Sequence, residues 1–298
     1  MSSSGKGDTP STSSPAAGEP YVLEYSVESP EAVGPELRRD SSKLIVRSDR
    51  REAFLEKHRS QSDRRGEPIG TFRAELDDGL AARILDEANR MLIPEPPAAG
   101  AGDEPGPIIV ALKFEQGARK VTRAFTTGDM ATLNAMRELL SELNQLSGQL
   151  NSHPKAALQA SVHYEEGETP HFVLTLTNIG TEPICFADPR FLPPGDPDHW
   201  AGAQVAELPE EKPDVTPPPL EWTRLLLDKP AEPAPEAPVV LEPGKSFSAK
   251  TVRWQNVKPK VRFLALGVYS DYTGPGEIAD VYRVRGATFS EGLEFEPK

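Results

Sequence analysis

The residue with the clearest potential for covalent chemistry is a single cysteine. Cys185 stands between Ile184 and Phe186, where the alternation of a strand predicts a buried side chain. A reactive thiolate needs a basic and partly exposed surrounding. We therefore interpret Cys185 as a core residue and not as a nucleophile.

Two histidines near acidic residues form the second candidate. His163 and His171 could meet across a hairpin, with Glu165 and Glu166 nearby as further ligands. A stable metal site generally has three or four ligands held in a fixed geometry. Two histidines on adjoining strands are more simply surface residues, so we predict neither a metal nor another cofactor.

Three further stretches resemble known motifs incompletely. "LEPGKS" ends like a phosphate-binding loop, but Val239 occupies the position of the required first glycine. "DPDHW", at Asp196–Trp200, lacks the spacing of a calcium loop, and we interpret it as a solvated turn. The sequence contains no G-x-S-x-G, H-E-x-x-H or G-x-G-x-x-G motif. We therefore predict no catalytic residue and a protein that is not an enzyme.

The charge and composition of the chain limit the classes of partner that it can bind. The chain has 33 basic and 46 acidic residues among 298, a formal net charge of -13, which repels nucleic acid and anionic membranes. No apolar run reaches the length of a membrane helix. Residues 1–20 are rich in Ser, Thr, Pro and Gly, so we expect a disordered tail. One cysteine is compatible with a reducing compartment, and we expect a cytoplasmic protein.

One segment has the opposite charge to the rest of the chain. Residues 47–65 have a formal excess of three positive charges, so an acidic partner could dock there. The alternative is a solvated loop or short helix, neutralised by the protein's own acidic surface. The candidate partner-binding residues of this segment are Arg50, Arg51, Arg59, Arg64 and Arg65.

Residues 21–152 have the pattern of an α+β domain. "YVLEYSVES", "SKLIVRS" and "GTFRAEL" predict strands, and "IIVALKF" with "RKVTRAF" predicts a hairpin. Apolar residues recur at helical spacing in residues 77–92, where Asp77 or Asp78 would cap the helix, and again in residues 129–150. We expect two helices on one face of an antiparallel sheet.

Residues 153–298 predict an all-β domain, a sandwich of the immunoglobulin-like type. The strongest pattern is "HFVLTLTNIGTEPICFADPRF", interpreted as two strands paired in a hairpin. In its first strand Phe172, Leu174 and Leu176 would face the core. Val173, Thr175 and Thr177 would face outward or toward a neighbour. The other predicted strands are "ALQASVHYE", "WTRLLL", "SFSAKTVRW", "VRFLALGVYSDY" and "VYRVRGATFSEGLEFE".

A proline-rich insertion interrupts this second domain at about residues 189–243. Because proline lacks an amide proton, we expect the insertion to run over the surface in extended form. Trp200 and Trp222 lie in it. They either pin a long loop to the sandwich or present an exposed recognition loop to a partner.

Two family resemblances add to this interpretation. The order of elements in residues 21–150, with "GTFRAELDDGLAARILDEANRML", "IIVALKF" and "KVTRAF", resembles the emfourin family of bacterial protease inhibitors. "FVLTLTNIGTEPICF" and "LEPGKSFSAKTVRW" are similar to the bacterial intracellular proteinase inhibitor family, which has an immunoglobulin-like fold. The basic segment and the proline-rich insertion depart from these patterns, so no inhibitory residue is carried over.

The sequence therefore supports three functional hypotheses. The first is a non-enzymatic cytoplasmic protein-binding protein, with a protease as one candidate partner. The second is a structural or scaffolding component of a larger bacterial assembly. The third is a small-ligand binder or enzyme with a site between the two domains.

Overall fold

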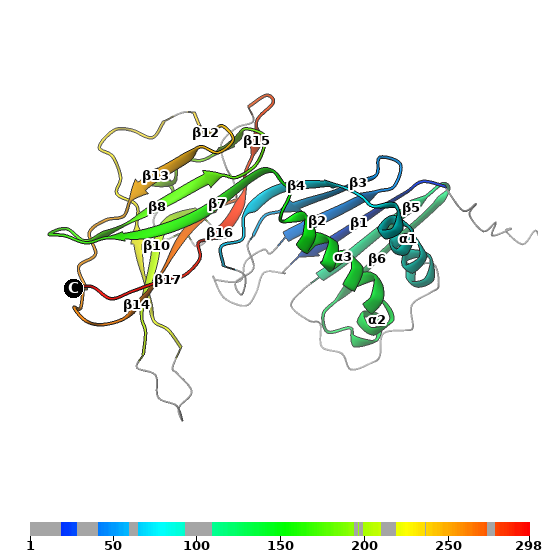
Figure 1. Ribbon diagram of the computed structural model, residues 1–298, viewed down its shortest axis with the longest axis horizontal. Coiled ribbons are helices and arrows are strands. Elements are labelled where there is room, and N and C mark those ends of the chain that lie inside the picture. Colours follow the sequence, from blue (N-terminus) through cyan, green and yellow to red (C-terminus); the bar gives the residue numbers. More distant parts are fainter. Residues whose placement is uncertain are drawn as a thin grey trace, which may run out of the picture.

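A nine-stranded antiparallel sheet runs through both halves of the chain (Figure 1). The computed structural model describes residues 19–28, 41–59, 65–92, 109–193, 196, 199–209, 219–235, 237–272 and 278–298. The tail expected at residues 1–20 lies almost wholly outside them. The strand order is β13-β8-β7-β4-β3-β2-β1-β5-β6. These strands are β1 (Tyr21–Glu28), β2 (Ser41–Arg47), β3 (Glu52–Lys57), β4 (Ile69–Glu75), β5 (Ile109–Gln116), β6 (Arg119–Thr126), β7 (Pro154–Glu165), β8 (His171–Asn178) and β13 (Ser246–Lys250).

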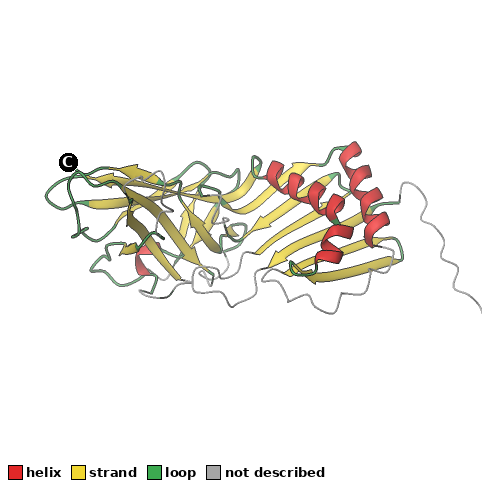
Figure 2. Ribbon diagram, turned by 90° about the horizontal axis from the view of Figure 1, so that it is seen from below, coloured by secondary structure: helices red, strands yellow, loops and turns green. Residues whose placement is uncertain are grey.

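Helices cover one face of the sheet at its β1–β6 end (Figure 2). They are α1 (Asp78–Leu92), α2 (Met130–Ala135) and α3 (Arg137–Leu150). The first begins as predicted, because the amide of Leu80 donates to Asp77 Oδ1 at 3.0 Å. The single helix predicted for residues 129–150 is interrupted at Met136, whose φ and ψ are -103° and 8°. None of these helices in the described part of the chain is long and apolar enough to span a membrane.

The core of this half follows the predicted periodicities. Leu23, Leu44 and Leu112 are fully buried on the helix side of the sheet, against Ile84 of α1 and Leu143 of α3. The strands supply alternate residues, and the helices supply one apolar stripe each. The opposite face of β1, β2, β3 and β5 carries the alternate residues of these strands, which are charged at Glu24, Lys43 and Lys113 and apolar at Ile45 and Phe54.

Strand β3 corrects the interpretation of the basic segment. Residues 52–57 are neither a solvated loop nor a short helix, because they pair with β2 and β4 inside the sheet. The side chains of Ala53, Leu55 and Lys57 are buried and alternate with half-buried neighbours. Lys57 forms an ion pair with Glu67. Buried and half-buried residues alternate in this strand, but the alternation is hard to recognise in the sequence because charged residues occupy several of the positions.

The second half packs two smaller sheets against the β13-β8-β7 end of the large sheet. One has the order β11-β10-β14-β16, with β17 also paired to β14, and the other has the order β12-β9-β15. The last predicted strand is divided into β15, β16 and β17. The bounds are β9 (Ile184–Phe186), β10 (His199–Glu207), β11 (Trp222–Leu226), β12 (Val239–Leu241), β14 (Phe263–Asp271), β15 (Tyr282–Arg283), β16 (Gly286–Phe289) and β17 (Leu293–Phe295), with a 3₁₀ turn, η1, at Pro189–Phe191.

The predicted hairpin in residues 171–188 is wrong. Strand β8 pairs with β7 and β13, whereas β9 pairs with β12 and β15 in another sheet. Between them the buried amide of Asn178 donates to the carbonyl oxygens of Glu182 and Leu241, and its Oδ1 accepts from the amide of Gly180. This corner sends the chain into a different sheet.

The inward set predicted for β8 is correct, since Phe172, Leu174 and Leu176 are fully buried or nearly so. Val173 was predicted to face outward or toward a neighbour, and the second holds, because it is only 6% exposed. It lies between β7 and β13, opposite His163 and Lys250. Neighbouring strands on both sides therefore cover a position that a single strand leaves open.

The proline-rich insertion also differs from its prediction. It contributes three strands, and β10 pairs with both β11 and β14. The residues of β10, β11 and β12 include no proline, so their amides are free to form ladder hydrogen bonds. Overall the described structure is mostly antiparallel β-sheet with three α-helices.

Candidate functional site

The two halves of the chain are joined by direct strand pairing. Strand β4 pairs with β7, so strands from both sides of residues 152–153 share one sheet. At this pairing Gly70 has a φ of 128°, and a Cβ there would collide with the backbone of Ala156 and Ala157. Only glycine permits so close an approach.

The segment that follows β3 forms a second connection. The amide of Ala287 donates to the carbonyl of His58 at 2.8 Å, and the amide of Gly66 donates to the carbonyl of Phe289 at 2.9 Å. The side chain of Thr288 donates to the carbonyl of Glu67 at 3.2 Å. Part of the basic segment thus docks onto strand β16 of the same chain.

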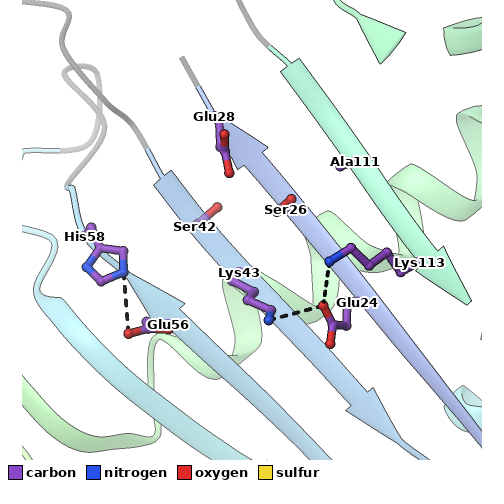
Figure 3. Close-up of a pocket in the computed structure, with 9 residues that line it drawn as sticks. All are labelled: Glu24, Ser26, Glu28, Ser42, Lys43, Glu56, His58, Ala111 and Lys113. Carbon is purple, nitrogen blue, oxygen red and sulfur yellow. Dashed lines mark ion pairs between the residues drawn. The ribbon is translucent and has the colours of Figure 1, made fainter. Parts of the chain in front are cut away.

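A first hollow lies on the helix-free face of the sheet (Figure 3). Its volume is about 280 Å³. Glu24 of β1 lines it and pairs with Lys43 of β2 at 3.1 Å and with Lys113 of β5 at 3.6 Å. The three side chains come from adjacent strands because alternate residues point to this face. Its lining comprises Glu24, Ser26, Glu28, Ser42, Lys43, Glu56, His58, Ala111 and Lys113.

A second and larger hollow, of about 740 Å³, adjoins the first where the two halves meet. Glu56 and His58 line both, and we call the two hollows together the junction trough. The second hollow is otherwise lined by residues from one C-terminal segment: Ile278, Ala279, Asp280, Val281, Tyr282, Arg283 and Arg285.

Hydrogen bonds connect the two sides of this hollow. The hydroxyl of Tyr282 donates to Glu56 Oε1 at 3.2 Å, and His58 Nε2 lies 3.4 Å from the same oxygen. The other ring nitrogen, Nδ1, lies 3.3 Å from the carbonyl oxygen of Arg285. Burial, and then the charge of Glu56, raise the pKa of Tyr282 well above its usual range, so this hydroxyl remains a donor at neutral pH.

Arg283 and Arg285 differ from the other cations of the trough. Lys43 and Lys113 share Glu24, whereas neither arginine side chain makes an ion pair or hydrogen bond with the described part of the chain. Arg283 Nε is buried without a hydrogen-bond partner among these residues. Arg285 is exposed. Two guanidinium groups with free donors therefore line the larger hollow.

The two predicted tryptophans lie elsewhere. Trp200 belongs to β10 and is 4% exposed, with the guanidinium of Arg224 5.0 Å from its ring centroid. Trp222, in β11, is half-buried and has the guanidinium of Arg65 at 5.8 Å. This contact brings two of the candidate residues together. Residues 199 and 200 are part of a strand and not of the solvated turn predicted for residues 196–200.

The candidate arginines of the basic segment have different surroundings. Arg50 and Arg51 are exposed in the turn between β2 and β3, where Arg51 pairs with Asp78 at 2.9 Å. Arg59 is buried, at 7% exposure. Arg64 lies outside the described residues. None of the sequence-predicted site residues within the described structure lines the junction trough.

The residues first considered for chemistry also have defined places. Cys185 is fully buried, as predicted, and burial raises the pKa of its thiol. Glu165 accepts from Lys250 at 2.8 Å and pairs with His171 at 2.8 Å. The hydrogen bond from Lys250, followed by those from the histidines, lowers the pKa of Glu165 to about 2. Among the described residues no group of three or more His, Cys, Asp and Glu side chains is arranged to hold a metal ion.

Sequence reasoning did not identify Glu56, His58, Tyr282, Arg283 and Arg285 as one site. A partial signal exists in "VYRVR", where two arginines two residues apart point to the same side of an extended chain. The hydroxyl of Tyr282 and its acceptor on Glu56 are 226 residues apart, so their meeting follows only from the fold.

The sequence matches no protein-family model and no curated protein.

Proposed function

We propose that this chain is a non-enzymatic protein-binding protein whose docking surface is the helix-free face of the nine-stranded sheet. The observation that supports the proposal is the junction trough, which crosses this face and extends into the second half. The helices occupy the opposite face. A partner on the trough would therefore contact both halves of the chain at once.

The connections between the halves also favour binding. The β4–β7 pairing and the docking of His58 onto β16 hold the two sides of the trough together. A surface that is already in place loses less conformational entropy when a partner docks. We further propose that the two halves are separate domains and that the second is an immunoglobulin-like sandwich. A cytoplasmic location and a protease as partner are also parts of this proposal, the latter because of the two family resemblances.

A comparison of surface variants tests the docking surface. The double variant Lys43→Glu, Lys113→Glu reverses two charges on the helix-free face. The control Arg83→Glu removes one ion pair on the helix side, where Arg83 lies 3.4 Å from Glu142. Each purified chain is immobilised and exposed to the same cell extract, and captured proteins are quantified by mass spectrometry.

We expect proteins that the original chain and Arg83→Glu capture equally and that the double variant loses at least ten-fold. The captured proteins are then assayed for protease activity, with and without added chain. Equal capture by all three chains would place the binding surface elsewhere. A captured non-protease assembly would favour the scaffolding alternative over inhibition.

A second candidate function has its own supporting observation. The larger hollow lies between the two halves and has polar groups from both, which suits a small-ligand site at a domain boundary. A screen of small carboxylates and phosphates by thermal shift tests it, since a ligand that binds only the folded chain raises its melting temperature. An unchanged melting temperature across the screen counts against this candidate.

A further inference from the structure

We propose that the junction trough binds an extended acidic peptide segment of a protein partner, with one peptide carboxylate held by Arg283 and Arg285. This inference rests on the proposed protein-binding function and names the chemistry of the partner. Three features of the trough support it: the free donors, the engaged carboxylate beside them, and the length of the trough.

The larger hollow has two guanidinium groups on its lining. Arg283 and Arg285 line the same hollow, and the Nε of Arg283 is buried without a hydrogen-bond acceptor in the described structure. A buried donor that lacks an acceptor is costly. A carboxylate matches the planar fork of a guanidinium and accepts two of its hydrogen bonds. The exposed guanidinium of Arg285 could therefore donate to an incoming carboxylate, with the positive charge of Arg283 beside it in the same hollow.

The same hollow also contains two acidic residues, Glu56 and Asp280. Glu56 Oε1 accepts from Tyr282 and lies 3.4 Å from His58 Nε2, so this oxygen is already engaged, and no ion pair joins Glu56 to either arginine. Asp280 is exposed and forms no ion pair with either arginine. The chain thus has two carboxylates in the hollow, and neither neutralises the arginines. In a protein with a formal net charge of -13, this leaves a local site for a negative group.

The trough is long enough for several residues of a peptide. From Glu56 and His58 the trough continues over side chains of β3, β2, β1 and β5. These include the cations Lys43 and Lys113 as well as the carboxylates of Glu24 and Glu28. Four neighbouring strands span three spacings of about 4.8 Å, or about 14 Å, which is the length of about four residues of extended chain. A single phosphate or acetate ion would fill only the arginine end. An extended peptide fills both hollows.

Fluorescence anisotropy with defined peptides tests the proposal. The probe is a fluorescein-labelled octapeptide of alternating glutamate and threonine, and its counterpart has glutamine in place of glutamate. Both are titrated with the full chain, with Arg285→Gln, and with the control Arg253→Gln. Arg253 is exposed and lies after β13, outside the trough. Arg283→Gln is a second variant, and the melting temperature of every variant is measured alongside.

We expect the glutamate peptide to bind at least ten-fold more tightly than the glutamine peptide. Arg285→Gln should weaken its binding at least ten-fold with an unchanged melting temperature, while Arg253→Gln should not. Added salt should weaken the interaction, because part of it is electrostatic. Inorganic phosphate should compete only weakly, since it would occupy one end of the trough.

Three results would overturn the inference: equal binding of the two peptides, equal losses in Arg285→Gln and Arg253→Gln, or full displacement of the peptide by an equal concentration of phosphate. The last result would assign a small-anion site instead. If Lys43→Glu, Lys113→Glu loses its captured proteins while Arg285→Gln retains them, the acidic-peptide inference fails and the protein-binding function stands. If neither variant changes capture, both fail.

Discussion

Replacing Gly286 by alanine should weaken the connection between the two halves of the chain. Gly286 begins β16 and has a φ of 123°, a conformation that L residues rarely adopt. A Cβ there would overlap the carbonyl oxygen of His58. That oxygen accepts the hydrogen bond from the amide of Ala287 at 2.8 Å, so the new methyl group forces apart the two segments that this bond joins.

The expected cost follows from these two effects. A non-glycine residue in a sparsely populated backbone region costs about 1–3 kcal/mol, and the loss of one hydrogen bond costs about 0.5–1.5 kcal/mol. We therefore expect Gly286→Ala to lower the free energy of unfolding by roughly 2–4 kcal/mol, because the overlap also requires some backbone displacement.

Urea unfolding measures this loss. All three tryptophans, Trp200, Trp222 and Trp254, lie in the second half, so their fluorescence follows that half, and far-UV circular dichroism follows the whole chain. The matched control is Gly148→Ala in α3, where no atom lies within 4 Å of the new Cβ. It should stabilise the chain by about 0.5–1 kcal/mol, since alanine is the better helix former.

Hydrogen exchange supplies a local measurement on the same variant. The amide of Ala287 should exchange faster in Gly286→Ala than in the original chain, whereas amides of α3 should change little. An unchanged free energy of unfolding together with an equally protected Ala287 amide would refute the reasoning about this contact.

Three further predictions concern single side chains. Leu174→Ala should cost about 2–5 kcal/mol in urea unfolding, because it leaves a cavity beside a fully packed core; a loss below 1 kcal/mol would contradict this packing. Asp129→Ala should cost about 1 kcal/mol, since its carboxylate accepts from the amide of Thr132 at 3.0 Å and caps α2, and Asp129→Asn, which retains an acceptor, should lose less. The lowered pKa of Glu165, about 2, means that the ionised carboxylate favours the folded state above pH 4.5 and that this contribution fades as the pH falls toward 2. Glu165→Gln should therefore reduce the melting-temperature difference between pH 5 and pH 2, and an identical pH profile would show that the bond from Lys250 does not stabilise the fold.

Some elements of this fold were predictable because their signals are local. The α1 helix has an apolar stripe and an aspartate at its start, and the β5–β6 hairpin has two strands around Gly117. Each of these signals lies within a few residues of the structure that it specifies. Burial of Cys185 and of alternate residues in β8 follows from the same kind of pattern.

Other elements could not be predicted from local patterns, because their formation depends on strands that are distant in the sequence. The charged strand β3 is stable because β2 and β4 flank it, and β10 lies between two strands although prolines precede and follow it. The corner at Asn178 predicted a turn, and it is one, but its amide bonds to the carbonyl of Leu241 direct the chain to another sheet. The division into two domains at residues 152–153 stays a prediction, because β4 and β7 pair across it.

By itself, the sequence determined which residues are buried in most elements, the acidic balance of the chain, and the mixture of strands with two helical regions. Only the tertiary structure decided which strands pair and where polar groups meet. Hydrophobic periodicity specifies the face that an element buries, but not the neighbour against which it is buried. The trough brings together Glu56, His58, Tyr282 and Arg285, because the sheet continues from one half of the chain into the other. These residues are too far apart in the sequence for a local pattern to predict their contact.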